Sequence, residues 1–139
     1  MTIGFYNPYF DGYGGGERYT LTLACHWSKQ HEVHLFWDDE NIILESLQRF
    51  NLDLSRVKVV QNIFREKKLF KKLFLTRKYD VIFFLTDGSI PTSFAGHNIL
   101  HVQIPFRRFP HASWKLRRYN AIVANSLFTK HNMDPRVGK

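Results

Sequence analysis

Short hydrophobic runs alternate along the chain with stretches of helical periodicity. Six runs have the composition of buried or half-buried strands, at residues 3–7, 32–37, 57–60, 80–85, 98–103 and 121–124. Helical patterns occupy residues 17–29, 42–50 and 64–78, and another begins over 126–131. This alternation predicts βαβ units, and hence an α/β, Rossmann-like fold in which helices cover both faces of a parallel sheet.

The segments that follow the predicted strands are expected to form one rim, because ligands of open parallel sheets bind at the carboxyl ends of the strands. These segments are residues 7–16, 38–39, 86–89, 103–108 and 125–126. Most of the polar residues considered below belong to them. The rim is therefore the place where the sequence predicts a binding site.

The first of these segments is rich in glycine, at positions 12, 14, 15 and 16. Glycine permits positive φ and close approach of a ligand to the backbone. A helix start behind it offers N–H groups and partial positive charge, so the segment predicts a phosphate site. The alternative is a glycine-rich connection without a ligand.

Two familiar nucleotide motifs do not fit this segment. The dinucleotide fingerprint G-x-G-x-x-G fails because Glu17 or Tyr19 occupies the third glycine position. Asp38 does end the second strand, where a ribose-binding acid would stand. A Walker A loop fails because no Gly-Lys-Ser/Thr follows the glycines. An NAD site is therefore not expected.

Composition indicates one globular domain over residues 1–139, with 44% hydrophobic residues and a single cysteine, Cys25. No apolar run approaches the roughly 18 residues that span a bilayer. No signal-peptide pattern opens the sequence. A cytoplasmic location is therefore expected, and a peripheral position at the inner membrane face is compatible with it. The charge is uneven: residues 1–55 carry −5 and residues 56–139 carry +13, which favours a polyanionic partner.

The predicted helix over residues 64–78 is strongly basic. Wound as a helix, it places Leu69, Phe70, Leu73 and Phe74 within one arc. Lys68, Lys71 and Lys72 lie on the other side of the helix, with Lys67 nearer the boundary. The helix either docks on the sheet with a solvated basic face or binds an anionic membrane surface. A nucleic-acid partner is not favoured, because no recognised nucleic-acid fold accompanies the charge.

A second basic cluster lies beside the fifth strand. Arg107 and Arg108, with Lys115, Arg117 and Arg118, suit a phosphate-bearing acceptor or a lipid headgroup, or form ordinary solvated surface. The spacing of the histidines at 97, 101 and 111 fits no zinc pattern, so no metal site is expected. His101 falls inside a strand and is a candidate for burial. No nucleophile–base pair can be assigned, and Ser89 lacks the G-x-S-x-G elbow.

Several short motifs, taken together, resemble a known enzyme family. They are Gly14-Gly-Gly-Glu17-Arg18, His31-Glu-Val-His-Leu, Asp87-Gly-Ser-Ile-Pro91, His101-Val-Gln-Ile-Pro-Phe106 and Ala124-Asn-Ser-Leu-Phe-Thr-Lys130. In this order they resemble the N-terminal domain of GT-B glycosyltransferases of family 4. The opening is most similar to the mannosyltransferases that extend lipid-linked oligosaccharides.

The resemblance implies transfer of a sugar, with retention, from a nucleotide-diphosphate donor to a glycan or lipid-linked acceptor. Gly14, Gly15 and Gly16 would face the donor diphosphate, and Asp87, Ser89, Asn125 and Ser126 would lie at the cleft rim. The nucleotide sugar is a co-substrate, and no other cofactor is implied. A C-terminal domain or separate chain is expected to complete the donor site, and residues 1–139 alone are expected to be inactive.

One position departs from the family pattern. Relatives often carry a histidine two residues before the proline that follows the fifth strand, and here Gln103 occupies that position. Glutamine can hydrogen-bond to a sugar hydroxyl but cannot carry a proton. His101 lies on the same strand face, so Gln103 and His101 are both candidates for a catalytic role. The alternative function is a non-catalytic, membrane-docking module that recruits a catalytic chain through helix 64–78.

Overall fold

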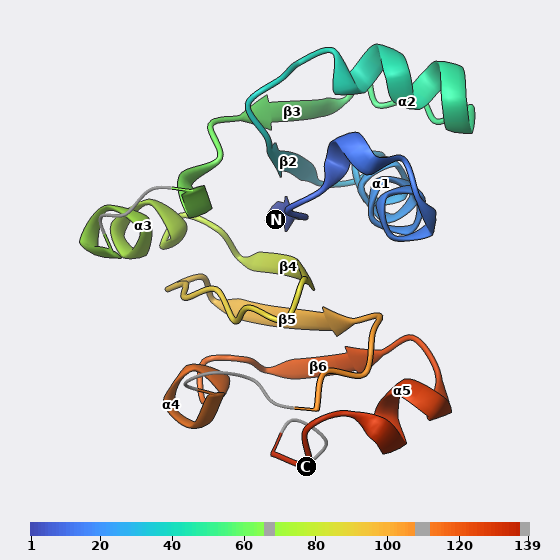
Figure 1. Cartoon of the computed structure of the whole chain (residues 1–139). Helices are drawn as coiled ribbons and strands as arrows, with labels where there is room; N and C mark the ends of the chain where they lie inside the picture. The colour runs from blue at the N-terminus through green and yellow to red at the C-terminus, as the bar shows by residue number, and fades with distance from the viewer. Residues whose placement is uncertain (66–68, 108–111, 137–139) are drawn as a thin grey trace.

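A computed structural model describes residues 1–65, 69–107 and 112–136. Its centre is a six-stranded sheet in the order β3-β2-β1-β4-β5-β6 (Figure 1). The strands are β1 (Thr2–Tyr6), β2 (Glu32–Phe36), β3 (Val57–Val60), β4 (Val81–Thr86), β5 (His97–Val102) and β6 (Ala121–Ala124). Every pairing between neighbouring strands is parallel. The α/β, Rossmann-like fold expected from the sequence is confirmed.

The helices are short and follow or precede the strands as in βαβ units. They are α1 (Gly15–Trp27), α2 (Ile42–Phe50), α3 (Leu69–Thr76), α4 (Ala112–Leu116) and α5 (Leu127–Asn132). Two 3-10 turns, η1 (Phe10–Gly12) and η2 (Ile63–Arg65), complete the described elements. The strand order reverses direction between β1 and β4, and such a switch point is where ligands of this fold class bind.

Two hydrophobic cores lie on opposite faces of the sheet. Because successive strand residues point to opposite sides, Phe83 joins one core and Phe84 the other. The first core contains Leu21 of α1 and Ile42 of α2. The second is covered by α3 and α4, through residues that include Leu75 and Leu116. In Figure 1, α1 and α3 accordingly lie on opposite sides of the central strands.

The connection from β4 to β5 crosses the α3/α4 face without a helix. Residues 87–96 form an extended crossover, anchored where the Phe94 N–H donates to Thr76 Oγ1 at 2.9 Å. The Tyr119 hydroxyl donates to the Pro91 carbonyl at 2.7 Å, and burial raises the pKa of this phenol. These contacts tie the crossover to the end of α3 and to the segment before β6.

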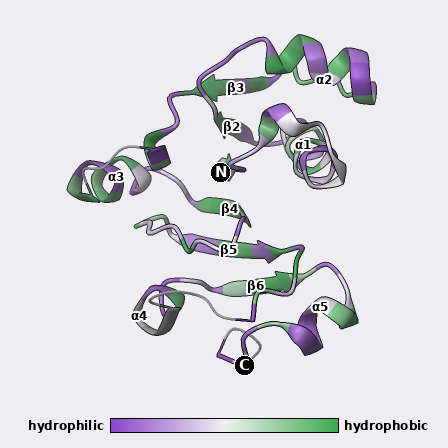
Figure 2. Cartoon of the chain, in the orientation of Figure 1, coloured by the Kyte–Doolittle hydropathy of each residue, from purple (hydrophilic) through white to green (hydrophobic). Residues whose placement is uncertain are grey.

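β5 differs in hydropathy from its neighbours. Figure 2 shows its neighbours β4 and β6 as hydrophobic, whereas β5 carries hydrophilic positions. These include Asn98 and His101, which are both buried. Asn98 is used structurally, since its Nδ2 donates to the Arg118 carbonyl at 2.9 Å and its N–H to Asn120 Oδ1. His101 belongs to the site described below.

The helices differ from the prediction in two places. Helix α4 was missed, because a five-residue helix is too short to show periodicity. Of the predicted helix over residues 64–78, the structure shows the end of the 3-10 turn η2 (Ile63–Arg65) and helix α3 (Leu69–Thr76), and residues 66–68 lie outside the described residues. Asn41 is the N-cap residue of α2, although its side chain makes no capping hydrogen bond. Its backbone is already helical, and its N–H donates to Asp39 Oδ1 at 3.0 Å instead.

Candidate functional site

The glycine-rich segment reaches α1 without using positive φ at its glycines. The left-handed residue is Tyr13, at φ 50°, whereas Gly14 is extended at φ −84°. Gly88, on the other side of the switch point, is the positive-φ glycine of the described residues. The expectation that these glycines provide left-handed backbone was therefore wrong. Their contribution is the absence of a side chain.

Glu17 holds this segment in place. Its Oε2 accepts a hydrogen bond from the Gly14 N–H at 2.8 Å, closing the first turn of α1. Its Oε1 accepts from Asn7 Nδ2 at 3.1 Å, and Asn7 is fully buried just after β1. Asn7 Oδ1 in turn accepts from the Tyr9 N–H. One carboxylate thus fixes the start of α1 relative to the end of β1.

The start of α1 is left open on the side away from Glu17. The first N–H groups of a helix have no intrahelical acceptor, and here they belong to Gly15, Gly16 and Glu17. A Cβ atom built on Gly15 would meet nothing within 4 Å, whereas one on Gly16 would overlap the Gln103 amide. Gly16 therefore allows the Gln103 side chain to pack against the helix start. Gly15 leaves room for a ligand.

These residues border a pocket of about 680 Å³ at the carboxyl ends of β5 and β6. The start of α1 forms one wall, and the segments after β5 and β6 form the others. Its lining consists of Gly15, Gly16, Tyr19, His101, Gln103, Ile104, Val123, Ala124 and Asn125. Three of the five segments expected at the rim therefore meet here. We call this the rim pocket.

His101 lies beneath the helix start, at the wall of the rim pocket. Its exposed fraction is 2%, because the Tyr19 ring stacks on it with centroids 4.7 Å apart. Its Nδ1 is buried and has no hydrogen-bond partner in the structure. Burial lowers the pKa of the imidazole, so His101 is neutral at pH 7. The burial expected of His101 is confirmed, and His101 lines the same pocket as Gln103.

This burial predicts a pH dependence of stability. The unfolded chain binds a proton at His101 near pH 6.5 and the folded chain only at lower pH, so stability is full above about pH 6.5 and falls below it. The slope is at most about 1.4 kcal/mol per pH unit for each such histidine. His34, whose pKa burial also lowers, contributes in the same direction.

We therefore expect His101→Phe to reduce the loss of stability on acidification while leaving stability near neutral pH unchanged or slightly higher. Phenylalanine keeps the stacking on Tyr19 and removes an unsatisfied buried nitrogen. Urea unfolding at about pH 7.5 and about pH 5.5 measures the difference. His97→Gln, at an exposed position, is the control. An unchanged pH slope in His101→Phe would contradict the prediction.

Asn125 and Ser126 lie next to each other but serve different purposes. Asn125 lines the rim pocket, and its Oδ1 accepts from the Thr129 hydroxyl at 2.6 Å. Ser126 is the N-cap of α5, where its Oγ accepts from the Thr129 N–H at 3.1 Å. Of this pair, only Asn125 is placed in the rim pocket.

Asp87 and Ser89 do not line the rim pocket. They form a tight turn after β4 in which the Ser89 N–H donates to Asp87 Oδ1 at 3.0 Å. Gly88 between them has φ 98° and lies against the Phe106 ring. The sequence placed both residues at the correct end of the sheet, but the turn is satisfied by its own hydrogen bonds.

The basic candidates are also outside the rim pocket. Arg107 is exposed after β5 and does not line it. Lys71 and Lys72 belong to α3, which covers the opposite face of the sheet from α1. Arg108, Lys67 and Lys68 lie outside the described residues. Of the described residues that line this pocket, none is a lysine or arginine.

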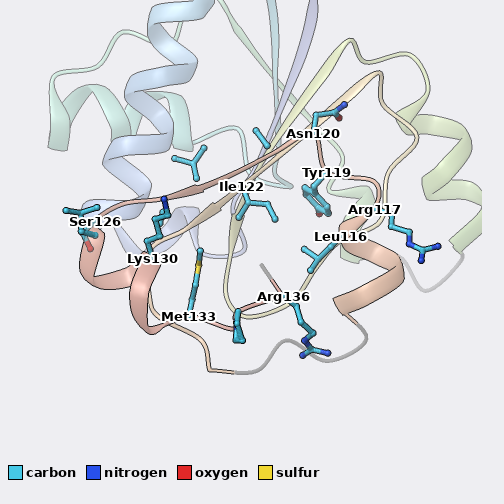
Figure 3. A pocket seen from close by; sticks show the side chains of 14 residues that line it. Leu116, Arg117, Tyr119, Asn120, Ile122, Ser126, Lys130, Met133 and Arg136 are labelled. Atoms are coloured by element: carbon cyan, nitrogen blue, oxygen red, sulfur yellow. The ribbon is translucent and has the colours of Figure 1, made fainter. Parts of the chain in front are cut away.

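A larger pocket of about 1040 Å³ runs along β6, between α4 and α5 (Figure 3). Apolar side chains such as Ile122 and Met133 line it beside Lys130 and Arg136. The Arg136 guanidinium Nε donates to the buried Asp134 carboxylate at 2.9 Å. β6 is the last strand of the sheet, so this pocket follows an edge. Few of the residues expected to form a site line this pocket, and Ser126 is one of them.

Two residues that shape the rim pocket were not singled out as site residues. Tyr19 covers His101 and lines the pocket. The sequence could have indicated this role, because Tyr19 lies one helical turn after Gly15 and Gly16. Asn7 anchors the loop through Glu17. The sequence could have indicated this role, because Asn7 is a polar residue directly after the central strand. Asp38, considered for ribose binding, accepts instead from the Asn62 N–H at 2.8 Å.

No protein-family profile, curated protein or solved structure matches the chain. Within residues 1–65, 69–107 and 112–136, no group of three or more histidine, cysteine or acidic side chains is placed to hold a metal ion. Nor is any helix in this part of the chain long and apolar enough to cross a bilayer. The function must therefore be argued from the rim pocket.

Proposed function

We propose that this chain is the acceptor-side domain of a retaining, family 4-like GT-B glycosyltransferase. The observation that carries the proposal is the convergence of distant motifs on one pocket. Gly15 and Gly16, Gln103, and Asn125 come from three motifs that resemble the family, and all line the rim pocket. Because the carboxyl ends of parallel strands meet at one edge of any such sheet, the support comes from the residue types brought together, which are glycines at a helix start and two side-chain amides.

The chemistry of the rim pocket supports an anionic, hydroxyl-rich ligand. The first turn of α1 offers N–H groups and partial positive charge to a diphosphate, and Gly15 has no side chain to obstruct it. Gln103 and Asn125 carry amides that can donate to and accept from sugar hydroxyls. No lysine or arginine lines the described pocket, so an anion here would be neutralised mainly by backbone dipoles and by groups from elsewhere.

The lack of basic side chains in the described pocket lining is consistent with a site that a second domain completes. In the proposed enzyme, a C-terminal domain or separate chain contributes most of the nucleotide-sugar contacts. His101 is neutral and covered by Tyr19, so we assign it a positioning role beside Gln103 rather than proton transfer. The donor sugar, bound between the two halves, would lie near Gln103.

Backbone amide NMR tests the proposal directly. Titration of the labelled chain with inorganic pyrophosphate, a nucleotide sugar or a mannose oligosaccharide is expected to shift the amide signals of Gly15, Gly16, Gln103 and Asn125. Affinity should be weak, on the order of millimolar, because half of the contacts are missing. The chain alone should not transfer sugar.

Two outcomes would count against the proposal. One is the absence of shifts with every nucleotide sugar although the spectrum is that of a folded protein. The other is a set of shifts confined to the edge pocket, at residues such as Ile122 and Lys130. Uridine and guanosine diphosphate sugars should be compared, since they differ in the base while sharing the diphosphate.

A further inference from the structure

Helix α3 exposes two aromatic side chains. Phe70 and Phe74 are 87% and 73% exposed, and their four-residue spacing places them side by side on one face. The sequence pattern had grouped them with Leu69 and Leu73 and left open whether they belong to the core. In the structure they do not.

The orientation of α3 is fixed by its other side. Thr76 is fully buried, and its hydroxyl donates to the Leu73 carbonyl and accepts from the Phe94 N–H. Leu75 packs against the core beneath the helix. These contacts hold Phe70 and Phe74 away from the sheet, toward solvent. Their exposure follows from how the helix docks.

A second helix presents an aromatic residue on the same side of the molecule. Trp114 of α4 is 52% exposed, while Leu116 of that helix packs on the same core as Leu75. Figure 1 shows α3 and α4 on the same side of the sheet. The crossover between β4 and β5 adds Phe94, which is 36% exposed. We call Phe70, Phe74, Phe94 and Trp114 the aromatic face.

Basic residues lie on the same segments of the chain as the aromatic face. Residues 69–78 contain four lysines or arginines and no acid, and residues 114–118 contain three and no acid. The Arg118 guanidinium lies 4.5 Å from the Phe94 ring centroid, and Lys115 Nζ lies 5.8 Å from that of Trp114. On the opposite face, α2 exposes Leu44 and Leu47 and carries one acid, Glu45, and one base, Arg49, so its charges balance. The two sides of the sheet are therefore unlike in charge.

We propose that the aromatic face docks on the surface of an anionic lipid bilayer. Phe70 and Phe74 enter the boundary between headgroups and acyl chains, and lysines and arginines of the same segments contact the headgroup phosphates. A bilayer is favoured over an acidic protein because the aromatic residues are spread over two helices and a crossover. The two described pockets lie elsewhere, at the rim and along β6.

Vesicle flotation with the full 139-residue chain tests this proposal. The chain is expected to float with vesicles of equimolar phosphatidylglycerol and phosphatidylcholine, and not with phosphatidylcholine alone. Phe70→Ser/Phe74→Ser should weaken partitioning about tenfold or more, since two inserted rings are lost. Arg77→Glu/Lys78→Glu, at exposed positions three and four residues after Phe74, should also weaken it, because each basic residue near the surface is worth about fivefold.

Phe128→Ser is the matched control, because Phe128 of α5 is 68% exposed but lies outside the aromatic face. It should float like the wild type. Circular dichroism checks folding, and Phe70→Ser alone serves if the double variant unfolds. The proposal is overturned if the wild type does not float, or if both phenylalanine variants float normally. Neither result bears on the rim pocket, since amide NMR in the absence of lipid tests the proposed function separately.

Discussion

Replacing Glu17 with alanine is expected to lower the free energy of unfolding by about 2–4 kcal/mol. Two hydrogen bonds to the carboxylate would be lost together, from the Gly14 N–H and from Asn7 Nδ2. Loss of a helix cap costs about 1 kcal/mol. A buried amide left without a partner costs a further 1–3 kcal/mol, and Asn7 is fully buried. Urea unfolding followed by circular dichroism measures the change.

Two further variants separate this contact from general effects of removing charge. Glu17→Gln keeps the size of the side chain but offers one carbonyl oxygen for two donors, so we expect an intermediate loss of stability. Glu40→Ala removes an exposed acid and should change stability by less than about 0.5 kcal/mol. A loss in Glu17→Ala no larger than in Glu40→Ala would refute the structural role of Glu17.

Glu17 also illustrates where the sequence was informative. The period and length of the hydrophobic runs located all six strands, since strands buried on both faces appear as continuous apolar segments such as residues 80–85. The same approach placed the start of α1 two residues late, at Glu17 instead of Gly15. Glycine has low helix propensity, so the pattern alone could not assign Gly15 and Gly16 to the helix.

The rim pocket was predictable in part, for topological reasons. Parallel strands bring their carboxyl ends to one edge, so the proximity of Gly16 to Gln103 and Asn125 follows from strand order and connection. The turn at Asp87 and Ser89 lies at the same edge but satisfies its own hydrogen bonds. Whether a turn forms its own internal hydrogen bonds depends on its backbone angles, above all the positive φ of Gly88. The sequence does not reveal these angles.

Helix α3 shows the corresponding limit for helix faces. The helical wheel correctly grouped Phe70 with Phe74, but an apolar arc does not say which of its members faces the sheet. The docked side is instead set by Leu75 and by Thr76, a polar residue whose hydroxyl is used twice. The sequence pattern does not single out Thr76, so it could not decide which side of the helix faces the sheet.

The second large effect is expected at Gly15, where an aspartate should weaken binding of pyrophosphate or a nucleotide sugar on the order of thirtyfold. A carboxylate at the first position of α1 would lie within several ångströms of an anion held by the helix start. Repulsion at that distance, reduced by solvent screening, amounts to about 2 kcal/mol. Titration calorimetry or amide NMR measures the affinity.

The same substitution should not harm the fold, which makes the result interpretable. A Cβ on Gly15 meets nothing within 4 Å, and an acid in the first turn of a helix is stabilising by about 0.3–1 kcal/mol. Gly15→Asn is the matched control, equal in shape and lacking the charge, and should retain most of the affinity. If Gly15→Asp binds as tightly as Gly15→Asn, the start of α1 does not hold the anion, and the assignment of the diphosphate to this end of the rim pocket is wrong.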